Sequence, residues 1–301
     1  MTLANHSNEH MIDSVVVASN RDLSLLDGCL RSLEPLTTRN GIQLIVARAA
    51  RPASSMPRLA EQFPFATFLE APRESSIPCL RGLGLLHASG RATAVTEDHC
   101  IASPDWLDRL SAAIGSADVV GGSMDNAQRG SVNWGAYFSE YGLFSPTRPE
   151  RFGGLPLLTG ANVAYVERVR ARVASWAAQG WWENRIHARL HEDGYSLRFA
   201  RDARVLQNSQ YQLLSFCRDR FQHGRNYAQT QGETQPLAWR VARATSAPML
   251  ALVLTARVAR ASAALHRGAF ARALPFTIAF LASWSAGEAA GYLSASAPFQ
   301  S

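Results

Sequence analysis

Apolar residues along positions 14–207 alternate between short continuous runs and longer segments with helical spacing. Residues 14–19 (SVVVAS) form a β-branched run that is typical of a strand buried on both faces. Residues 23–35 place leucines at helical spacing, and we expect Pro35 to end this helix. Similar strand-like runs, separated by helical segments, follow at 42–47, 65–69, 92–96, 118–122, 159–166, 196–200 and 203–206. This alternation predicts parallel βαβ units and therefore an α/β fold.

Residues 123–158 interrupt this alternation, because they have no clean period and are rich in aromatic side chains. Aromatic faces pack well against sugar rings and apolar chains, so this segment is a candidate wall or lid beside a bound acceptor. A second small hydrophobic core explains the same residues equally well.

From Thr245 onward the composition changes to alanine, leucine, valine and arginine. The apolar runs at 248–255 and 274–284 are each shorter than the ~20 residues that a membrane-spanning helix needs. Three arginines, Arg257, Arg260 and Arg267, fall on one side of a helical wheel, which predicts amphipathic helices lying on an anionic membrane surface. A buried helical hairpin is an equally good interpretation. We expect a loose N-terminus at 1–12, an α/β domain at 13–235 and a helical, amphipathic extension at 236–301.

The chain carries a formal net charge of +6, with a pI of about 9.5. This balance fits a phosphate-bearing substrate, an anionic membrane surface or nucleic acid. The arginines are dispersed and no nucleic-acid-binding motif is present, so we expect no nucleic-acid partner. Four scattered cysteines without a CxxC pair favour a reducing compartment. The polar N-terminus does not resemble a signal peptide, and we therefore predict a cytoplasmic protein that contacts the inner face of the membrane peripherally.

Three ligand-capable residues, Glu97, Asp98 and His99, come directly after the apolar run at 92–96. A buried strand that ends in such residues presents them at the carboxyl edge of a sheet, where open α/β sheets bind ligands. Carboxylate oxygens and an imidazole nitrogen suit Mn²⁺ or Mg²⁺, and the metal ion can in turn hold a diphosphate. A solvated strand–helix loop is the alternative.

Two other motifs have simpler explanations. Gly82 and Gly84 form a GxG pair, but the pair lies inside a helical pattern, where small residues permit close packing rather than dinucleotide binding. His187 and His191 are four residues apart on a predicted helix, but no glutamate follows His187 as in a zinc protease. We interpret both histidines as part of a solvated helix face.

The order of the motifs resembles that of family-2 glycosyltransferases, which have the GT-A fold: a mostly parallel sheet flanked by helices. SVVVASNRD resembles their first strand and nucleotide-contacting loop, and TEDH stands where their DxD-type metal motif stands. TGAN resembles their acceptor-loop motif, and WWENRIHARLHEDGY their catalytic segment. FCRDRFQHGRNYA resembles the basic helix that follows. The resemblance covers roughly residues 13–229, and a helical C-terminal extension comes after it.

The resemblance implies transfer of a sugar from a nucleotide-diphosphate sugar to a hydroxyl group, with inversion of the anomeric centre and no covalent intermediate. Glu183 stands at the position of the catalytic base. The implied donor-binding residues are Ser19, Asn20, Arg220 and Arg225. The implied ligands of Mn²⁺ or Mg²⁺ are Glu97, Asp98 and His99. The implied acceptor contacts are Gly160, Asn162 and Trp182. The amphipathic C-terminus and the aromatic segment suggest a glycan or lipid-linked acceptor, as in cell-envelope synthesis.

The sequence departs from the family pattern at several places. The second strand ends in Ala47-Arg48-Ala49 instead of the acid pair that binds the nucleobase and ribose, so the donor nucleotide is not assigned. His99 replaces the second aspartate of the metal motif, and Glu183 replaces an aspartate. The altered end of the second strand and the Trp182-Glu183 motif favour a second hypothesis, a catalytically degenerate GT-A-fold binding module. A nucleotidyltransferase would need a glycine-rich phosphate loop after the first strand, and ASNRDLS contains no glycine.

Overall fold

The structure is a computed structural model that describes residues 11–50, 55–148, 157–233 and 235–294. The chain forms two compact units: residues 1–125 with 149–208, called the sheet unit here, and residues 126–148 with 209–301, called the helical unit. The aromatic segment and the basic helix that follows the last strand therefore group with the C-terminal helices, whereas the sequence assigned them to a domain of residues 13–235. Of the N-terminal segment expected to be loose, Ile12 is buried in the core.

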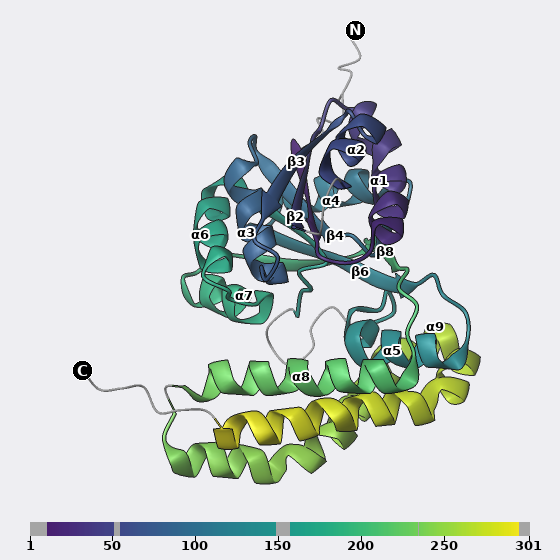
Figure 1. Cartoon of the computed structure of the whole chain (residues 1–301), viewed down its shortest axis with the longest axis vertical. Coiled ribbons are helices and arrows are strands. Elements are labelled where there is room, and N and C mark those ends of the chain that lie inside the picture. Colours follow the sequence, from purple (N-terminus) through teal and green to yellow (C-terminus); the bar gives the residue numbers. More distant parts are fainter. Residues whose placement is uncertain (1–10, 51–54, 149–156, 234, 295–301) are drawn as a thin grey trace, which may run out of the picture. The chain divides into compact units, whose positions relative to one another are not determined.

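The sheet unit is built on an eight-stranded sheet with the order β3-β2-β1-β4-β7-β6-β8-β5 (Figure 1). Its strands are β1 (Ser14–Ser19), β2 (Gln43–Ala49), β3 (Ala66–Ala71), β4 (Ala92–Glu97), β5 (Cys100–Ala102), β6 (Val119–Asn126), β7 (Asn162–Val166) and β8 (Leu197–Gln207). Strands β1 to β4 pair in parallel, as predicted. Strand β7 runs antiparallel to β4 and β6, and β5 runs antiparallel to β8, so the sheet as a whole is mixed. The two short strands predicted between 196 and 206 are one continuous strand, β8.

Helices cover both faces of this sheet (Figure 1). One face carries α1 (Leu23–Thr38), α2 (Ser55–Gln62) and α4 (Trp106–Ile114), and the other carries α3 (Ile77–His87), α6 (Glu167–Ala178) and α7 (Glu183–Glu192). Helix α1 continues through Pro35, so the prediction that this proline ends it is wrong. Leu36 and Thr37 in its last turn are buried, and their packing outweighs the missing backbone hydrogen bond.

The glycines of α3 bring this helix close to its neighbours. A Cβ atom at Gly82 would overlap the backbone of Ala178 on α6, and one at Gly84 would overlap the side chain of Val16 on β1. The prediction that these glycines serve close packing is confirmed. The backbone of α3 is therefore fixed against both the sheet and α6.

The helical unit contains α5 (Ser131–Tyr141), a 3-10 turn (Gly142–Phe144), α8 (Leu213–Gly232) and α9 (Leu237–Ser294). Helix α9 is bent at His266. Its two arms, Leu237–Ser262 and Leu265–Ser294, are 26 and 30 residues long and are apolar enough to cross a membrane by length and composition alone. From the sequence, the apolar runs were expected to be too short to span a membrane. The helices that contain them are longer than the runs themselves. Only 22% and 28% of their most apolar windows are buried in the protein, unlike the core helix of a soluble domain.

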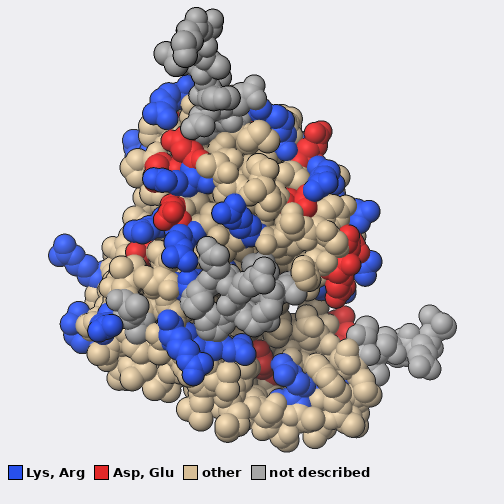
Figure 2. All heavy atoms as spheres, turned by 180° about the vertical axis from the view of Figure 1, so that it is seen from behind, with Lys and Arg blue, Asp and Glu red and all other residues tan. Residues whose placement is uncertain are grey.

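The exposed charged side chains of α9 are all positive. Its arginines are Arg240, Arg243, Arg257, Arg260, Arg267 and Arg272, and its one acid, Glu288, is buried. Exposed apolar side chains, among them Met249, Leu252 and Leu265, lie on the same helix. On the face that Figure 2 shows, basic side chains are spread among large uncharged areas.

The strand order places a topological switch point between β1 and β4, because β2 lies on one side of β1 and β4 on the other. The crevice at the carboxyl ends of two such strands is the usual ligand site of an open α/β sheet. Ser19 ends β1 and Glu97 ends β4. The predicted motifs of both strands therefore meet at this edge.

Candidate active site at the carboxyl edge of the sheet

Two predicted site residues, Glu97 and Glu183, are joined by an arginine that lies outside the sequence motifs. Arg81 on α3 donates a hydrogen bond from Nη2 to Glu97 Oε1 and another from Nη1 to Glu183 Oε2, the latter at 2.8 Å. The side chains of Arg81 and Glu97 are only 8% and 9% exposed, whereas that of Glu183 is 23% exposed. Glu183 is the member of this ion-pair cluster that solvent, or a substrate, can reach.

The charges of the cluster depend on each other. Burial opposes the charged form of Arg81, but Glu183 and Glu97 raise the pKa of its guanidinium above the usual value. Burial likewise opposes the charged form of Glu183, but Arg81 holds the pKa of this carboxyl below its ordinary value of 4.5. Both groups are therefore ionised at neutral pH, and each is the principal partner of the other.

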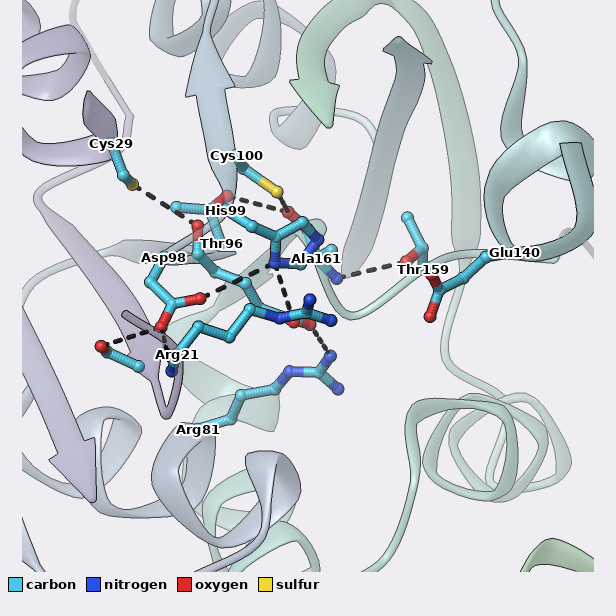
Figure 3. Close-up of polar contacts among 12 residues, drawn as sticks. Arg21, Cys29, Arg81, Thr96, Asp98, His99, Cys100, Glu140, Thr159 and Ala161 are labelled. Atoms are coloured by element: carbon cyan, nitrogen blue, oxygen red, sulfur yellow. Dashed lines mark hydrogen bonds and ion pairs between the residues drawn. The ribbon is translucent and has the colours of Figure 1, made fainter. Parts of the chain in front are cut away.

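Gly160 makes room for the arginine. A Cβ atom at Gly160 would overlap the Arg81 guanidinium, so no other residue fits there unless Arg81 moves. The following Ala161 is held by two neighbours: its carbonyl accepts from Thr96 Oγ1 at 2.9 Å, and its N–H donates to Thr159 Oγ1 at 3.2 Å (Figure 3). The loop predicted to contact the acceptor thus lies beside the Arg81 cluster.

A second polar cluster links the ends of β1, β2 and β4. Asp98 Oδ2 accepts hydrogen bonds from Ser19 Oγ at 2.9 Å and from the Arg21 backbone N–H at 2.8 Å (Figure 3). The buried Arg48 donates to Ser19 Oγ and, at 3.0 Å, to the carbonyl of Arg21. His99 is buried, with Nδ1 3.6 Å from Glu97 Oε2 and 3.8 Å from Asp98 Oδ1.

These contacts decide how well the residues fit a metal ion. Carboxylate and imidazole donors have the right chemistry for Mn²⁺. However, one Glu97 oxygen is engaged by Arg81, and Asp98 Oδ2 is engaged by Ser19 and Arg21. Among the residues that the structure describes, no three His, Cys, Asp or Glu side chains are grouped to hold a metal ion. As arranged, Glu97, Asp98 and His99 do not fit a metal, and we assign no chemical step to one.

Asn162, predicted to contact the acceptor, forms hydrogen bonds within the fold. Its Oδ1 accepts from Trp106 Nε1 at 2.9 Å, and its Nδ2 donates to the carbonyls of Ser123 at 2.8 Å and Ala203 at 2.9 Å. The side chain is fully buried, and these bonds tie β7 to α4, β6 and β8. The acceptor role of Asn162 stays a prediction, and these hydrogen bonds give its side chain a structural role. Trp182 differs, because it is 41% exposed next to Glu183.

His187 is a residue that the sequence placed wrongly. It is buried, with Nε2 2.9 Å from the Tyr165 hydroxyl, and burial lowers its pKa to about 4. Only His191 of the pair lies on the solvated helix face. A signal was present, because Glu183, His187 and Leu190 share one helical face by spacing. Arg81 was likewise detectable as the single arginine inside the apolar segment IPCLRGLGLLHA.

Arg220 and Arg225, predicted to bind the donor, belong to α8 of the helical unit. The Arg220 guanidinium lies 4.4 Å from the Trp284 ring centroid and 4.0 Å from Glu140 Oε1, and burial lowers its pKa. Arg225 is half-buried, and its backbone lies against Gly291 of α9. Their contribution to donor binding stays a prediction.

Comparison with known proteins identifies the fold. No protein-family model matches the chain, and no curated protein sequence matches it either. Among solved structures, it is similar to mannosyltransferase PcManGT from Pyrobaculum calidifontis in complex with GDP-Man and Mn²⁺, with a TM-score of 0.55 and 15% identity over 93% of this chain and 88% of that one. The chain has a GT-A fold. It is also similar to GalNAc-T7 with UDP, GalNAc and Mn²⁺, with a TM-score of 0.51 and 16% identity over 67% of this chain and 44% of that one.

Proposed function

We propose that this protein is a glycosyltransferase that moves a sugar from a nucleotide-diphosphate sugar to a hydroxyl group of an acceptor. The observation that carries the proposal is the Glu183 carboxylate, which is partly exposed at the carboxyl edge of a GT-A sheet and connected to Glu97 through Arg81. The solved structures with a similar fold hold GDP-Man, or UDP with GalNAc, which supports a nucleotide sugar as the donor.

Glu183 is the proposed general base. It takes the proton of the acceptor hydroxyl while that oxygen bonds to the anomeric carbon of the donor. The bond from this carbon to the diphosphate oxygen breaks, and the leaving diphosphate keeps the electron pair. A single displacement of this kind inverts the anomeric centre. A positioned base contributes about 10²–10⁴-fold to the rate.

The other proposed roles follow from position. Ser19 ends β1 at the switch point and Asn20 follows it, and there the two would orient the donor. Trp182 offers an exposed ring beside Glu183, a suitable surface for an acceptor sugar. A role for Mn²⁺ or Mg²⁺ stays a prediction, because its expected ligands do not form a metal site as arranged.

One observation favours the alternative of a GT-A-fold binding module without catalysis. Buried Arg48 stands at the end of β2, where the family-2 enzymes have acids for the nucleobase and ribose, and it is occupied with Ser19 and the Arg21 carbonyl. Such a protein would bind a nucleotide sugar, or none, without turning it over.

Release of nucleoside diphosphate from UDP- and GDP-sugars, with glycoside and polyprenyl-phosphate acceptors and with or without Mn²⁺, distinguishes the two. We expect turnover with one donor and a loss of about 10²–10⁴-fold in Glu183→Gln. Glu192→Gln, at the exposed other end of α7, is the matched control and should keep the wild-type rate. Absence of turnover with every donor, in a protein that unfolds cooperatively, would support the binding module. The anomeric configuration of the product, read by NMR, tests inversion.

The acceptor is proposed to be a glycan or lipid-linked glycan at the inner face of a membrane. The support is α9, whose two long apolar arms are mostly unburied and carry exposed arginines without exposed acids. Sedimentation with vesicles containing anionic lipid tests this. Binding should weaken in Arg257→Glu/Arg260→Glu and persist in Arg201→Glu, a change to an exposed arginine of β8. A wild-type protein that remains in the supernatant would remove the support for a membrane acceptor.

A further inference from the structure

The Arg81 cluster has a feature that the proposed function does not explain. Its two carboxylates, Glu97 and Glu183, come from the two motifs to which the chemistry is assigned, yet both bind the same guanidinium. A base paired with a cation is a weak base, and a metal ligand paired with a cation is not available to a metal. The described arrangement therefore restrains both groups at once.

We infer that Arg81 is the resident counter-cation of this site, and that a divalent cation can bind Glu97 only after the Arg81 side chain has been displaced. The inference deepens the proposed function and rests on it for the roles of Glu97 and Glu183. It also explains why these residues do not fit a metal as they stand.

The surroundings of Arg81 restrict how it can be displaced. The backbone of α3 is held by the close approaches of Gly82 to α6 and of Gly84 to β1, so the helix cannot shift without loss of packing. Gly160 leaves the space that the guanidinium occupies. Displacement is therefore a movement of the Arg81 side chain, and the helix that carries it stays in place.

Charge at the site supports the exclusion of a metal. The Arg81 guanidinium bonds directly to Glu97 and Glu183, so a divalent cation at Glu97 would lie close to a fixed positive charge. Withdrawing Arg81 removes this repulsion and leaves the two carboxylates without their cation.

Suitable donors are already adjacent to Glu97. His99 Nδ1 lies 3.6 Å from Glu97 Oε2 and 3.8 Å from Asp98 Oδ1, and this mixed oxygen and nitrogen set suits Mn²⁺. Arg81 holds the other oxygen of this carboxylate, Oε1, and its positive charge opposes a cation at Oε2. Removing the guanidinium by mutation should therefore create metal affinity in a protein without any nucleotide.

The test is Mn²⁺ binding to the full chain, measured by the EPR signal of unbound Mn²⁺ in the absence of nucleotide and acceptor. We expect Arg81→Met to bind Mn²⁺ at least about tenfold more tightly than the wild type, because a unit charge at contact distance is removed. The gain should vanish in Arg81→Met/Glu97→Gln. Arg109→Met, which removes an exposed arginine of α4, should behave as the wild type. Equal affinity of the wild type and Arg81→Met overturns the inference.

A second measurement needs only the wild type, in case Arg81→Met does not fold. With histidine selectively labelled, Mn²⁺ added to the ligand-free protein should leave the NMR signals of His99 unbroadened. Paramagnetic broadening of His99 at Mn²⁺ concentrations that leave His191 unaffected would overturn the inference. Neither measurement requires sugar transfer, so a failed proposed function and a failed counter-cation role give different results.

Discussion

Arg81 in the sheet unit and Arg220 in the helical unit are buried to the same degree, with side chains 8% and 9% exposed, in opposite surroundings. Arg81 bonds directly to two carboxylates, and these raise its pKa against the effect of burial. Arg220 lies over the Trp284 ring with its nearest acid oxygen 4.0 Å away, and burial lowers its pKa. A buried arginine therefore indicates a charged site only when its partners are charged. Otherwise it is a large packing group with a polar end.

The largest expected difference between the two is in stability. Arg81→Met leaves two carboxylates without their cation, and removing one partner of a buried ion pair costs about 3–5 kcal/mol. We expect this loss in the free energy of unfolding, measured by urea denaturation at pH 7. Hydrogen exchange should show the loosening in β4 and in the first turn of α7. A loss below about 1 kcal/mol would mean that the ion pairs are no stronger than exposed ones.

Acid should destabilise the surroundings of Arg81 through His187. Burial holds the pKa of His187 at about 4, against 6.5 in the unfolded chain, so between these values only the unfolded chain takes up the proton. The contribution of His187 to stability is therefore fully present above pH 6.5 and is lost as the pH approaches 4. At about 1.4 kcal/mol for each pKa unit, the loss is on the order of 3 kcal/mol.

Urea denaturation at several pH values between 6.5 and 4 measures this loss. His187→Gln, which cannot take up the proton, should flatten the dependence in this range. His191→Gln, on the exposed face of the same helix, should leave it unchanged. Below pH 4.5 a further decline is expected, because Arg81 also depresses the pKa of Glu183. A slope in His187→Gln as steep as in the wild type would assign the acid sensitivity to other groups.

Glycine substitutions probe the space around each arginine. Gly160→Ala drives a methyl group into the Arg81 guanidinium, and Gly224→Ala drives one into the backbone carbonyl of Trp284 beside Arg220. Overpacking of this kind costs about 1–3 kcal/mol. Gly115→Ala is the control, because nothing lies within 4 Å of its Cβ position and its backbone is in the right-handed helical region.

Gly160→Ala and Gly224→Ala should differ in their effects on function, although both lower stability. Gly160→Ala displaces Arg81, so it should alter Mn²⁺ binding and sugar transfer in addition to stability. Gly224→Ala separates α8 from α9 and should change stability without creating metal affinity. A Gly160→Ala protein with wild-type transfer and metal binding would show that the site tolerates movement of Arg81.

Much of the sheet unit was predictable because each element buries its own apolar run. β1 matches its predicted bounds residue for residue, and His187 and His191 lie on a helix, α7, as predicted. The direction of β7 was not predictable, because the same apolar pattern fits a parallel or an antiparallel strand. The sequence predicted that Glu97 and Glu183 both belong to the functional site, but it could not pair them with Arg81. The pairing joins Arg81 on α3 to Glu183 on α7, and these two residues are 102 positions apart in the sequence.

Burial of polar side chains was the harder part to predict. Asparagine is mostly exposed in proteins and histidine is intermediate, so residue type alone did not predict that Asn162 and His187 are buried. Their burial depends on hydrogen-bond partners from other parts of the sequence, among them Trp106 for Asn162 and Tyr165 for His187. A linear motif gives the type and spacing of such a residue. It does not give the hydrogen-bond partner that allows its polar side chain to be buried.

The smallest expected effect is that of Arg220→Met. Methionine keeps most of the apolar contact with Trp284, and the substitution removes a cation–π contact together with a long hydrogen bond of 3.5 Å to the Ser139 carbonyl. No carboxylate is left at bonding distance without its cation, since Glu140 is 4.0 Å away. We therefore expect a loss of less than about 2 kcal/mol in urea denaturation, compared with about 3–5 kcal/mol for Arg81→Met. Equal losses in the two variants would refute the comparison, because Glu140 would then be as dependent on Arg220 as Glu97 and Glu183 are on Arg81.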